Sequence, residues 1–343
     1  MTHVDLALIG FGNVGRALAV LLMQKRAEVE QKYGITYRVT GIATGRHGAA
    51  IDPAGLDLER ALALVQAGQT LDSLSIVSAP ADGVAFVRAV PAQVMFENSP
   101  VNRDTGQPAV DHIRTALEGG MHAITANKGP VAHAYRELTE LAARQGRRFL
   151  YESTVMDGAP IFSTFRGPLP AANIQRLRGI LNSTTNLILE MMEGGQSYEE
   201  ALRYCQQVGL AETDPSADVD GWDSSIKVAI LSTVLMGVKI TPQDVGRSGI
   251  RGITREMVQE ALQAGERWKL VCSAERDGAG VRARVAPQRL PAADHLYSIR
   301  GSGSGVEFDL DIQPGLGIYK DDSGPETTAY GLLADMINAV RGA

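Results

Sequence analysis

The densest group of ionisable side chains lies between Gly209 and Lys227. Five carboxylates fall within residues 212–223, and a lysine closes the segment four residues after Asp223. Residues four apart share one face of a helix, so Asp223 and Lys227 are expected to meet. Burying a carboxylate is unfavourable unless a cation or donors compensate it. Because an apolar run follows at residues 228–236, we expect a loop at the edge of a core rather than a solvated one. Its acids would face a cation, such as a substrate ammonium group.

A glycine-rich turn near the N-terminus predicts a dinucleotide site. An apolar run at residues 4–9 leads into Gly10-Phe11-Gly12-Asn13-Val14-Gly15, and a helical pattern extends from residue 13 to about 31. In such a strand–turn–helix unit the first glycine permits the tight turn and the second lets a pyrophosphate approach the backbone. The third lets the helix pack close to the strand. The pyrophosphate would lie on the helix N-terminus, whose free N–H groups attract an anion.

The end of the second predicted strand, residues 37–43, bears on the choice of cofactor. It continues into Thr44-Gly45-Arg46-His47, and no acid follows before Asp52. An acid at this point usually holds the ribose 2′-hydroxyl of NAD, whereas an arginine accommodates the 2′-phosphate of NADP. Arg46, with Thr44 on the same turn, therefore predicts NADP as the preferred cofactor and NAD as the second. The alternative is that Arg46 is only a surface arginine.

Polar residues follow two further predicted strands, residues 94–97 and 123–126, and another strand is predicted at 74–78. Asn98 and Ser99 come after the first, and Asn127 and Lys128 after the second. Ligands of open α/β sheets bind at the carboxyl ends of strands, so Lys128 is expected near a nicotinamide. A lysine there can donate to a carbonyl oxygen or relay a proton; alternatively, it only caps the loop. A doubly wound parallel sheet of the Rossmann type is predicted.

The middle of the chain predicts a second, α+β domain. Strands are expected at 147–155, 174–181, 280–287 and 306–312, and an amphipathic helix at 325–340. Asn182, Ser183 and Thr184 open a helix at 187–193. Such a turn offers N–H groups and hydroxyls to a carboxylate or aldehyde oxygen, or it simply caps the helix.

Composition narrows the functional class. A length of 343 residues suggests two domains, and a net charge of −6 argues against nucleic acid as a partner. No apolar run is long enough for a membrane span, and we expect no signal peptide, because no basic region followed by an apolar stretch comes before the first predicted strand. Two cysteines, Cys205 and Cys272, indicate a reducing compartment, which we expect to be the cytoplasm. The six histidines show no metal-binding spacing.

Together these motifs resemble the homoserine dehydrogenase family. The resemblance rests on Gly10–Gly15, on Thr125–Pro130, on Gly179–Asn186 with Ser183 in place of the usual glycine, and on the complete acidic segment Gly209–Lys227. A last match lies at Gly324–Ala329. The resemblance implies an NAD(P)H-dependent interconversion of L-aspartate 4-semialdehyde and L-homoserine, on the route to threonine and methionine.

The resemblance also implies roles for individual residues. Lys227 would act at the reacting oxygen with Lys128 as partner or relay, and Glu212 would hold the substrate ammonium. Asp223 would bind the substrate or orient Lys227, and Asp218 would bind the substrate. Asn182, Ser183 and Thr184 would line the amino-acid end of the substrate. Gly324, Glu326 and Thr327 would join the cofactor site. A structural monovalent cation, Na⁺ or K⁺, is expected near Glu152, Val155, Asp157 and Ala159, held mostly by carbonyl oxygens.

The family's domain plan would divide the chain into a nucleotide domain, 1–135, closed by a helix at 318–343, and a substrate-binding and dimerisation domain, 136–317. A homodimer without a regulatory domain is expected.

Three rival functions remain. An aldehyde dehydrogenase that forms a thiohemiacetal needs a reactive cysteine, and neither cysteine lies in a loop motif. The others are another amino-acid dehydrogenase and a non-catalytic dinucleotide sensor.

Overall fold

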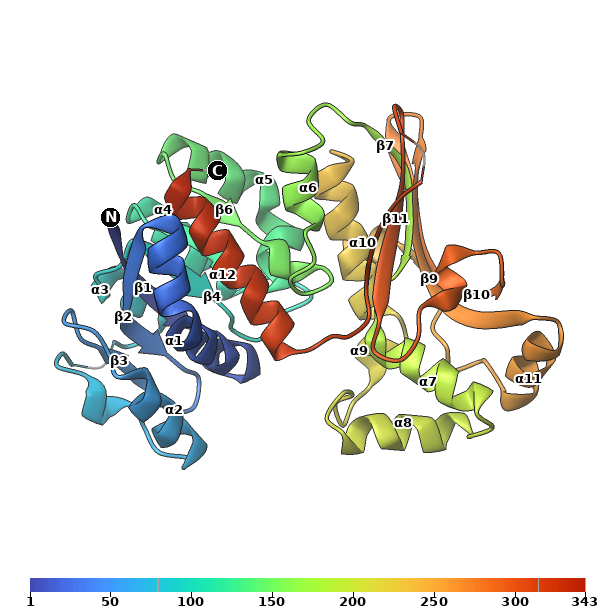
Figure 1. Ribbon diagram of the computed structural model, residues 1–343, viewed down its shortest axis with the longest axis horizontal. Coiled ribbons are helices and arrows are strands. Elements are labelled where there is room, and N and C mark those ends of the chain that lie inside the picture. The colour runs from blue at the N-terminus through green and yellow to red at the C-terminus, as the bar shows by residue number, and fades with distance from the viewer. Residues whose placement is uncertain (79, 314, 343) are drawn as a thin grey trace. The chain divides into compact units, whose positions relative to one another are not determined.

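The computed structural model describes residues 1–78, 80–313 and 315–342. The chain folds into two compact units, one formed by Met1–Gly158 with Gly324–Ala343 and the other by Ala159–Ser323. Each unit contains one six-stranded sheet (Figure 1). The first unit extends past the expected limit at residue 135 because β6 (Phe149–Leu150) joins its sheet beside β5 (His122–Thr125).

The sheet of the first unit has the strand order β3-β2-β1-β4-β5-β6. Its other strands are β1 (Thr2–Ile9), β2 (Ile35–Ala43), β3 (Ala49–Ile51) and β4 (Val94–Glu97). All neighbouring strands pair in parallel except β3, which runs antiparallel to β2. This confirms the Rossmann-type parallel sheet. The order reverses between β1 and β4, and a dinucleotide binds at such a reversal.

Helices pack around this sheet, and the last helix of the chain is one of them. They are α1 (Asn13–Tyr33), α2 (Leu58–Gln66), α3 (Gly83–Ala89), α4 (Ala109–Glu118), α5 (Lys128–Arg144) and α12 (Pro325–Arg341), with short 3₁₀ turns η1 (Asp72–Leu74) and η2 (Glu152–Thr154). Leu332 and Met336 of α12 are fully buried in one core with Leu18 and Leu22 of α1. Apolar burial therefore attaches the chain's end to its N-terminal sheet.

Two predicted strands that fall in this unit are wrong in whole or in part, and one of them, at 147–155, was predicted for the second domain. Residues 74–78 form no strand, because Ile76 and Val77 are exposed and one backbone bond, Ile76 N to Ile51 O, links them to β3. The strand predicted at 147–155 is reduced to β6. Beyond it the chain coils into η2 and passes through left-handed conformations at Met156 and Asp157, which no strand accommodates.

The second unit has a mixed sheet of order β12-β11-β7-β9-β10-β8. Its strands are β7 (Ile174–Ile180), β8 (Gly246–Arg247), β9 (Glu266–Asp277), β10 (Gly280–Pro291), β11 (Ser304–Leu310) and β12 (Leu316–Lys320). The central strand β9 was not predicted, because charged residues occupy both of its ends and Lys269 interrupts its apolar part. With strands and helices in this arrangement, the unit fits the α+β class predicted for it.

Helices of this unit are α6 (Ile161–Arg166), α7 (Ser183–Glu193), α8 (Tyr198–Gln207), α9 (Ser216–Val219), α10 (Trp222–Leu235) and α11 (Arg255–Gln263), with 3₁₀ turns η3 (Pro242–Asp244) and η4 (His295–Ser298). One face of the sheet is apolar: Phe308 of β11 is fully buried and packs edge-on against Phe165 of α6, 4.9 Å between ring centroids.

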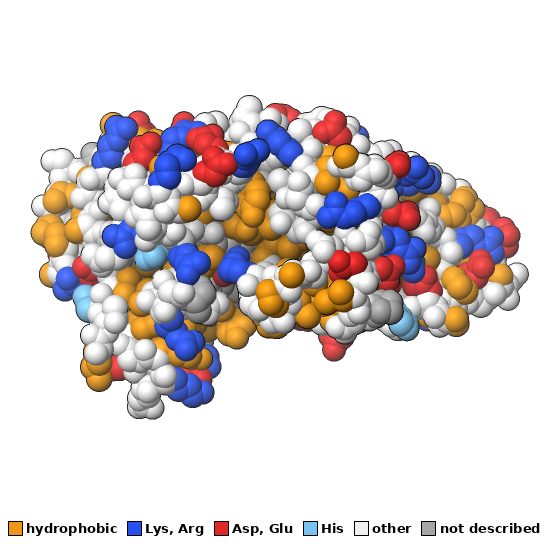
Figure 2. Space-filling model, turned by 90° about the horizontal axis from the view of Figure 1, so that it is seen from above, with side chains coloured by type: hydrophobic (Ala, Val, Ile, Leu, Met, Phe, Trp, Pro, Cys, Tyr) orange, Lys and Arg blue, Asp and Glu red, His pale blue; other side chains and the backbone are white. Residues whose placement is uncertain are grey.

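A row of charged side chains crosses the other face. The register aligns Asp309, Arg176, Glu275 and Arg282 on four adjacent strands, so acidic and basic residues alternate. Acidic and basic side chains are also interspersed on the molecular face seen in Figure 2. Among the described helices, none is long and apolar enough to cross a membrane.

Candidate functional site

The three glycines of the turn after β1 serve different purposes. The fold requires glycine at two of these positions and tolerates a side chain at the third. Gly10 has φ +85°, and a Cβ there would lie 2.2 Å from the carbonyl oxygen of Asn98. A Cβ on Gly15 would lie 2.2 Å from Gly10 O. A Cβ on Gly12, in contrast, would meet nothing within 4 Å. Gly12 therefore leaves space open at the N-terminus of α1, where no side chain caps the helix, and a pyrophosphate group fits that space.

Further predicted residues lie at the same edge of this sheet. Because β1, β4 and β5 are parallel, their carboxyl ends bring the glycine turn, Asn98, Ser99 and Lys128 to one edge. Asn98 N donates to Ile9 O (2.7 Å), and Asn127 Nδ2 donates to Ser99 O (2.9 Å). Both polar atoms of the Asn98 side chain are buried without a hydrogen-bond partner among the described residues. Such atoms are rare in folded proteins, and they suit a polar ligand such as a cofactor.

The turn after β2 presents Arg46. The Thr44 hydroxyl closes this turn, since Oγ1 donates to Gly48 O (3.0 Å) and accepts from His47 N (2.6 Å). Arg46 is exposed at the turn's tip. A phosphate contact by Thr44 would compete with these two bonds, so the guanidinium is the stronger candidate for a phosphate.

The segment expected to hold a cation contacts the start of α12. Glu152 is buried, and its N–H donates to Asp335 Oδ2 (2.9 Å). The Asp157 carboxylate accepts from the hydroxyls of Thr327 (3.3 Å) and Thr328 (3.2 Å). Thr327 Oγ1 also lies 2.9 Å from Gly324 O. Asp157 therefore stabilises the N-terminus of α12. Val155 is buried, Glu326 is exposed, and Ala159 begins the second unit.

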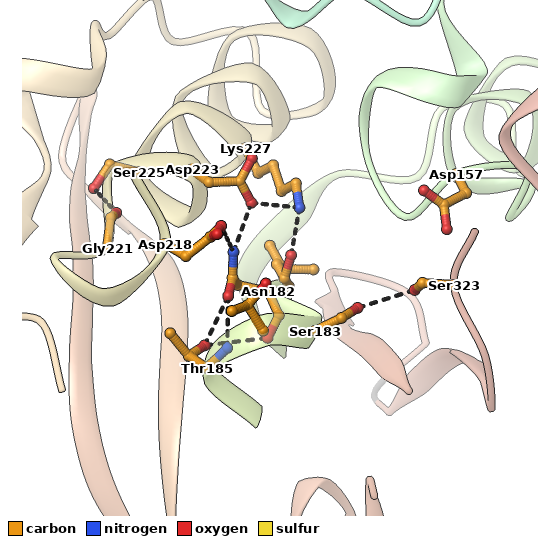
Figure 3. A network of polar contacts seen from close by, with 12 residues as sticks. Asp157, Asn182, Ser183, Thr185, Asp218, Gly221, Asp223, Ser225, Lys227 and Ser323 are labelled. Carbon is orange, nitrogen blue, oxygen red and sulfur yellow. Dashed lines mark hydrogen bonds and ion pairs between the residues drawn. The ribbon is translucent and has the colours of Figure 1, made fainter. Parts of the chain in front are cut away.

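A polar network in the second unit joins the substrate turn to the acidic segment (Figure 3). Asn182 Nδ2 donates to Asp218 Oδ1 (2.7 Å) and to Asp223 Oδ2 (3.0 Å). Lys227 forms an ion pair with Asp223 (2.7 Å) and donates to Leu181 O (2.6 Å). The i,i+4 pair is thus present as predicted, on the first turns of α10. Asn182, the N-cap of α7, links it to Asp218 on α9.

The charges of this network do not balance. Asp218 and Asp223 carry two negative charges against the one positive charge of Lys227. Burial, followed by the nearby Asp223 carboxylate, raises the pKa of Asp218 above its ordinary 3.8. Two carboxylates that repel each other in a partly buried site favour a second cation, and a substrate ammonium would supply it.

The remaining predicted substrate residues differ in how they connect to this network. Ser183 Oγ donates to Ser302 O (2.8 Å) and Thr184 Oγ1 to Leu210 O (3.1 Å), so both join neighbouring loops. Glu212 is exposed, and no hydrogen bond or ion pair joins its carboxylate to the network among the described residues. Lys128 belongs to the first unit and Lys227 to the second.

Sequence reasoning missed two buried polar residues beside the substrate turn. Lys269 of β9 is 1% exposed, and Asn186 of α7 is fully buried; the two are joined by a hydrogen bond of 2.7 Å. Asn186 closes the run of small polar residues that begins at Asn182, which was the available signal for it. The sequence offered no comparable signal for Lys269, apart from its charge within an apolar stretch.

Neither cysteine is suited to nucleophilic chemistry. Cys205 and Cys272 are free and buried, and burial raises the pKa of each thiol to about 11. A thiolate is the reactive form, so this weighs against the thiohemiacetal route. Among the described residues, no three His, Cys, Asp or Glu side chains cluster as metal ligands would.

Comparison with known proteins gives matches along most of the chain. Residues 160–337 match the family model described as homoserine dehydrogenase, and residues 10–152 match that of the homoserine dehydrogenase NAD binding domain. The chain is 35% identical to an NAD(+)-dependent homoserine dehydrogenase of Pseudomonas canavaninivorans, over 98% of this chain and 96% of that protein. It is 34% identical to a homoserine dehydrogenase of Methanocaldococcus jannaschii, over 98% of both.

Solved structures resemble the fold over the same extent. A hyperthermophilic archaeal homoserine dehydrogenase in complex with NADPH is 26% identical, with a TM-score of 0.84 over 100% of this chain and 99% of that one. A homoserine dehydrogenase from Thiobacillus denitrificans is 28% identical, with a TM-score of 0.83 over 99% of this chain and 74% of that one.

Proposed function

The chain belongs to the homoserine dehydrogenase family and is an NAD(P)-dependent oxidoreductase, and on this premise we propose how its residues divide the reaction. Lys227 acts at the oxygen of the reacting carbon, which is the alcohol oxygen of L-homoserine or the aldehyde oxygen of L-aspartate 4-semialdehyde. The observation that carries this proposal is the network of Asn182, Asp218, Asp223 and Lys227.

The chemistry of that oxygen explains why an ammonium is needed. The bound nicotinamide supplies or accepts the hydride at the neighbouring carbon. As the aldehyde is reduced, negative charge develops on its oxygen, and Lys227 stabilises that charge and provides a proton. Asp223 and Leu181 O orient the ammonium and compensate its charge. Lys128, at the strand-end edge of the first unit, is the second lysine and the partner or relay.

The substrate's amino-acid end is recognised by the acidic segment and the turn that opens α7. Asp218 and Asp223 attract the substrate ammonium because their network lacks one positive charge. Glu212 adds a further carboxylate from the preceding loop. Asn182, Ser183 and Thr184 line the same end, where hydroxyls and N–H groups at a helix N-terminus suit a carboxylate.

The cofactor is held by the edge of the first sheet. The glycine turn from Gly10 to Gly15, with Phe11, Asn13 and Val14, receives the pyrophosphate. Asn98, Ser99 and Lys128 face the nicotinamide end, and Gly324, Glu326 and Thr327 complete the site. NADP is preferred over NAD, because Arg46 lies where NAD-dependent proteins usually have an acid that accepts a hydrogen bond from the ribose 2′-hydroxyl. One relative is NAD(+)-dependent and another binds NADPH, so relatives do not decide the preference.

Two further features follow from the family. A structural monovalent cation, Na⁺ or K⁺, lies near Glu152, Val155, Asp157 and Ala159, bound mainly by carbonyl oxygens, since Asp157 already accepts from Thr327 and Thr328. The enzyme works in the cytoplasm, in threonine and methionine biosynthesis.

A homodimer forms through the open face of the second sheet. Its row of alternating charge is self-complementary, because a two-fold axis can set the acidic positions of one copy against the basic positions of the other. Arg176, Glu275 and Arg282 line a shallow hollow on this face, of about 270 Å³.

The experiment that tests the activity follows reduced nicotinamide by absorbance, with homoserine against serine, threonine and other hydroxy-amino acids. Homoserine should give the highest kcat/KM, and NADP a lower KM than NAD. Faster turnover of another amino acid would favour a different dehydrogenase. Cofactor binding without any turnover would favour a dinucleotide sensor.

A further inference from the structure

Lys269 is a buried lysine for which the reaction has no use. Its side chain is 1% exposed and donates to Asn186 Oδ1 (2.7 Å) and to Ile299 O. The two acceptors belong to different segments: Asn186 lies in the second turn of α7, and Ile299 begins the loop 299–303 before β11. One ammonium group therefore joins that loop to the helix that carries the substrate turn.

Other bonds hold the same two segments together. Asn186 Nδ2 donates to Gly301 O (2.9 Å), and Glu190 of α7 accepts from Gly301 N. Arg300 pairs with Glu190 (2.7 Å) and with Glu193 (3.0 Å). The loop is thus bound to α7 along one side, with Lys269 at the buried end of the contact.

The loop in turn contacts the predicted substrate turn. Ser302 O accepts from Ser183 Oγ (2.8 Å) and from Ser323 Oγ (3.0 Å). Ser183 is the first residue of α7, and Asn182 beside it holds Asp218 and Asp223. A displacement of the loop would therefore also displace the Ser183 side chain.

The charge of Lys269 makes its burial unfavourable. Glu190 and Glu193 are matched by Arg267 and Arg300, so the lysine is an additional cation in this cluster. Burial lowers its pKa to about 8, against the opposing effect of Glu193 and Glu190. An apolar residue of similar length would avoid this unfavourable burial. What it would not supply is the pair of bonds to Asn186 and Ile299.

We propose that Lys269 is a positioning residue that fixes the loop 299–303 against α7 and thereby sets the substrate turn at residues 182–184. The proposal rests on the proposed function only in that these three residues face the substrate. Lys269 itself touches neither substrate nor cofactor; its effect passes through Asn186, the loop and Ser183.

The test compares Lys269→Met with Leu270→Ala, which removes a buried side chain from the opposite face of the same strand. Lys269→Met should raise the KM for homoserine roughly tenfold, as expected for loss of a buried hydrogen-bonded group, and leave the KM for the cofactor unchanged. Hydrogen exchange should accelerate in residues 299–303 and 182–186. Leu270→Ala should lower the unfolding temperature without either effect.

Two further variants make the outcome decisive. If Lys269 acts through Ser183, then Lys269→Met combined with Ser183→Ala should raise KM by less than the product of the increases seen in the two single variants. If Lys269→Met does not fold, Glu190→Gln loosens the same loop from a partly exposed position and should raise both KM and exchange.

Wild-type KM and exchange in Lys269→Met would overturn the proposal, as would an equal KM increase in Leu270→Ala. A wild type that oxidises no homoserine would overturn the proposed function instead, because the exchange measurement still tests the connection between the loop and α7.

Discussion

At the scale of single residues, the candidate site is an arrangement of one lysine, two carboxylates and one amide. Asn182 donates to both carboxylates, and Asp223 pairs with Lys227. Each residue therefore affects the charge or the orientation of another. Substitutions that remove a charge while keeping the size of the side chain are the most informative.

Lys227→Met should lower kcat by at least about a hundredfold, because the developing charge on the substrate oxygen would lose its ammonium. The KM for the cofactor should stay near that of the wild type. Lys239→Met, on an exposed segment after α10, is the matched control and should be fully active. A kcat near normal in Lys227→Met would show that another group acts on the oxygen, and the same measurement on Lys128→Met would test the second lysine.

Asp218→Asn should stabilise the protein at neutral pH. The pKa of Asp218 is raised by burial and by Asp223, so its favourable contribution is fully present only below the unfolded value of 3.8 and is lost as pH rises through the folded value. The variant stays neutral, and its advantage in unfolding temperature should shrink as pH falls through that window.

Asp311 provides the control for this pH series, because its pKa is shifted in the opposite direction. Bonds from the Asn173 side chain and backbone lower the pKa of Asp311. Asp311→Asn should therefore be less stable than the wild type at neutral pH, with the difference shrinking as pH falls. Parallel curves for the two variants would contradict both assignments.

At the scale of elements, the proposed cofactor site lies on turns at the carboxyl ends of parallel strands. The β1–α1 turn needs glycine for two different reasons, contact within the fold at Gly10 and open space at Gly12. The β2 turn presents a cation instead of an acid. Both features lead to predictions that separate folding from ligand binding.

Gly12→Ala should keep the unfolding temperature of the free protein, because its Cβ would meet nothing within 4 Å. It should raise the cofactor KM about tenfold or more, which corresponds to roughly 1.4 kcal/mol of lost binding. Gly10→Ala should instead lose several kcal/mol of stability, through its left-handed φ and a clash with backbone. Thermal unfolding and cofactor titration of both variants distinguish these effects. Equal destabilisation by the two substitutions would contradict the distinction.

Arg46→Ala should change the ratio of KM values for NADP and NAD by about ten- to a hundredfold in favour of NAD, the range for one charge-assisted contact of roughly 1.5–3 kcal/mol. Steady-state kinetics with each cofactor measure it. Arg60→Ala, on α2 of the same unit, should leave the ratio unchanged. A wild type that prefers NAD would refute the argument from the missing acid.

At the scale of the whole molecule, the two sheets contribute to different parts of the proposed function. The first is parallel except for β3, and we propose that the carboxyl ends of its parallel strands hold the cofactor. The second buries one face and presents a row of alternating charge on the other. A surface of this kind is suited to a second copy of the chain, whose mass is 36.6 kDa.

Sedimentation velocity should give twice the chain mass at low salt. Arg176→Glu should shift the protein toward monomer, because it would set an acidic side chain against the acidic positions of the second copy across the proposed two-fold axis. Arg136→Glu reverses an exposed charge on α5 and should leave the mass unchanged. A wild type that sediments as a monomer would remove the dimer from the proposal.

The sequence by itself determined the features that depend on neighbours along the chain. The Gly10–Gly15 turn, the parallel sheet and the Asp223–Lys227 pair could all be predicted, because tight turns, apolar periodicity and helical spacing are local. Family membership followed from the same ordered motifs. Local signals also misled: the apolar residues Ile76 and Val77 read as a strand yet are exposed.

Only the tertiary structure decided which distant side chains meet. Asn182 bonds Asp218 and Asp223 across separations of 36 and 41 residues, while Glu212 lies outside that network although it is closer in sequence to both acids. The contacts of Lys269 span 83 residues to Asn186. Such partners depend on how strands cross and register in a sheet, and on which buried polar groups must satisfy one another. Neither is encoded in a short window of sequence.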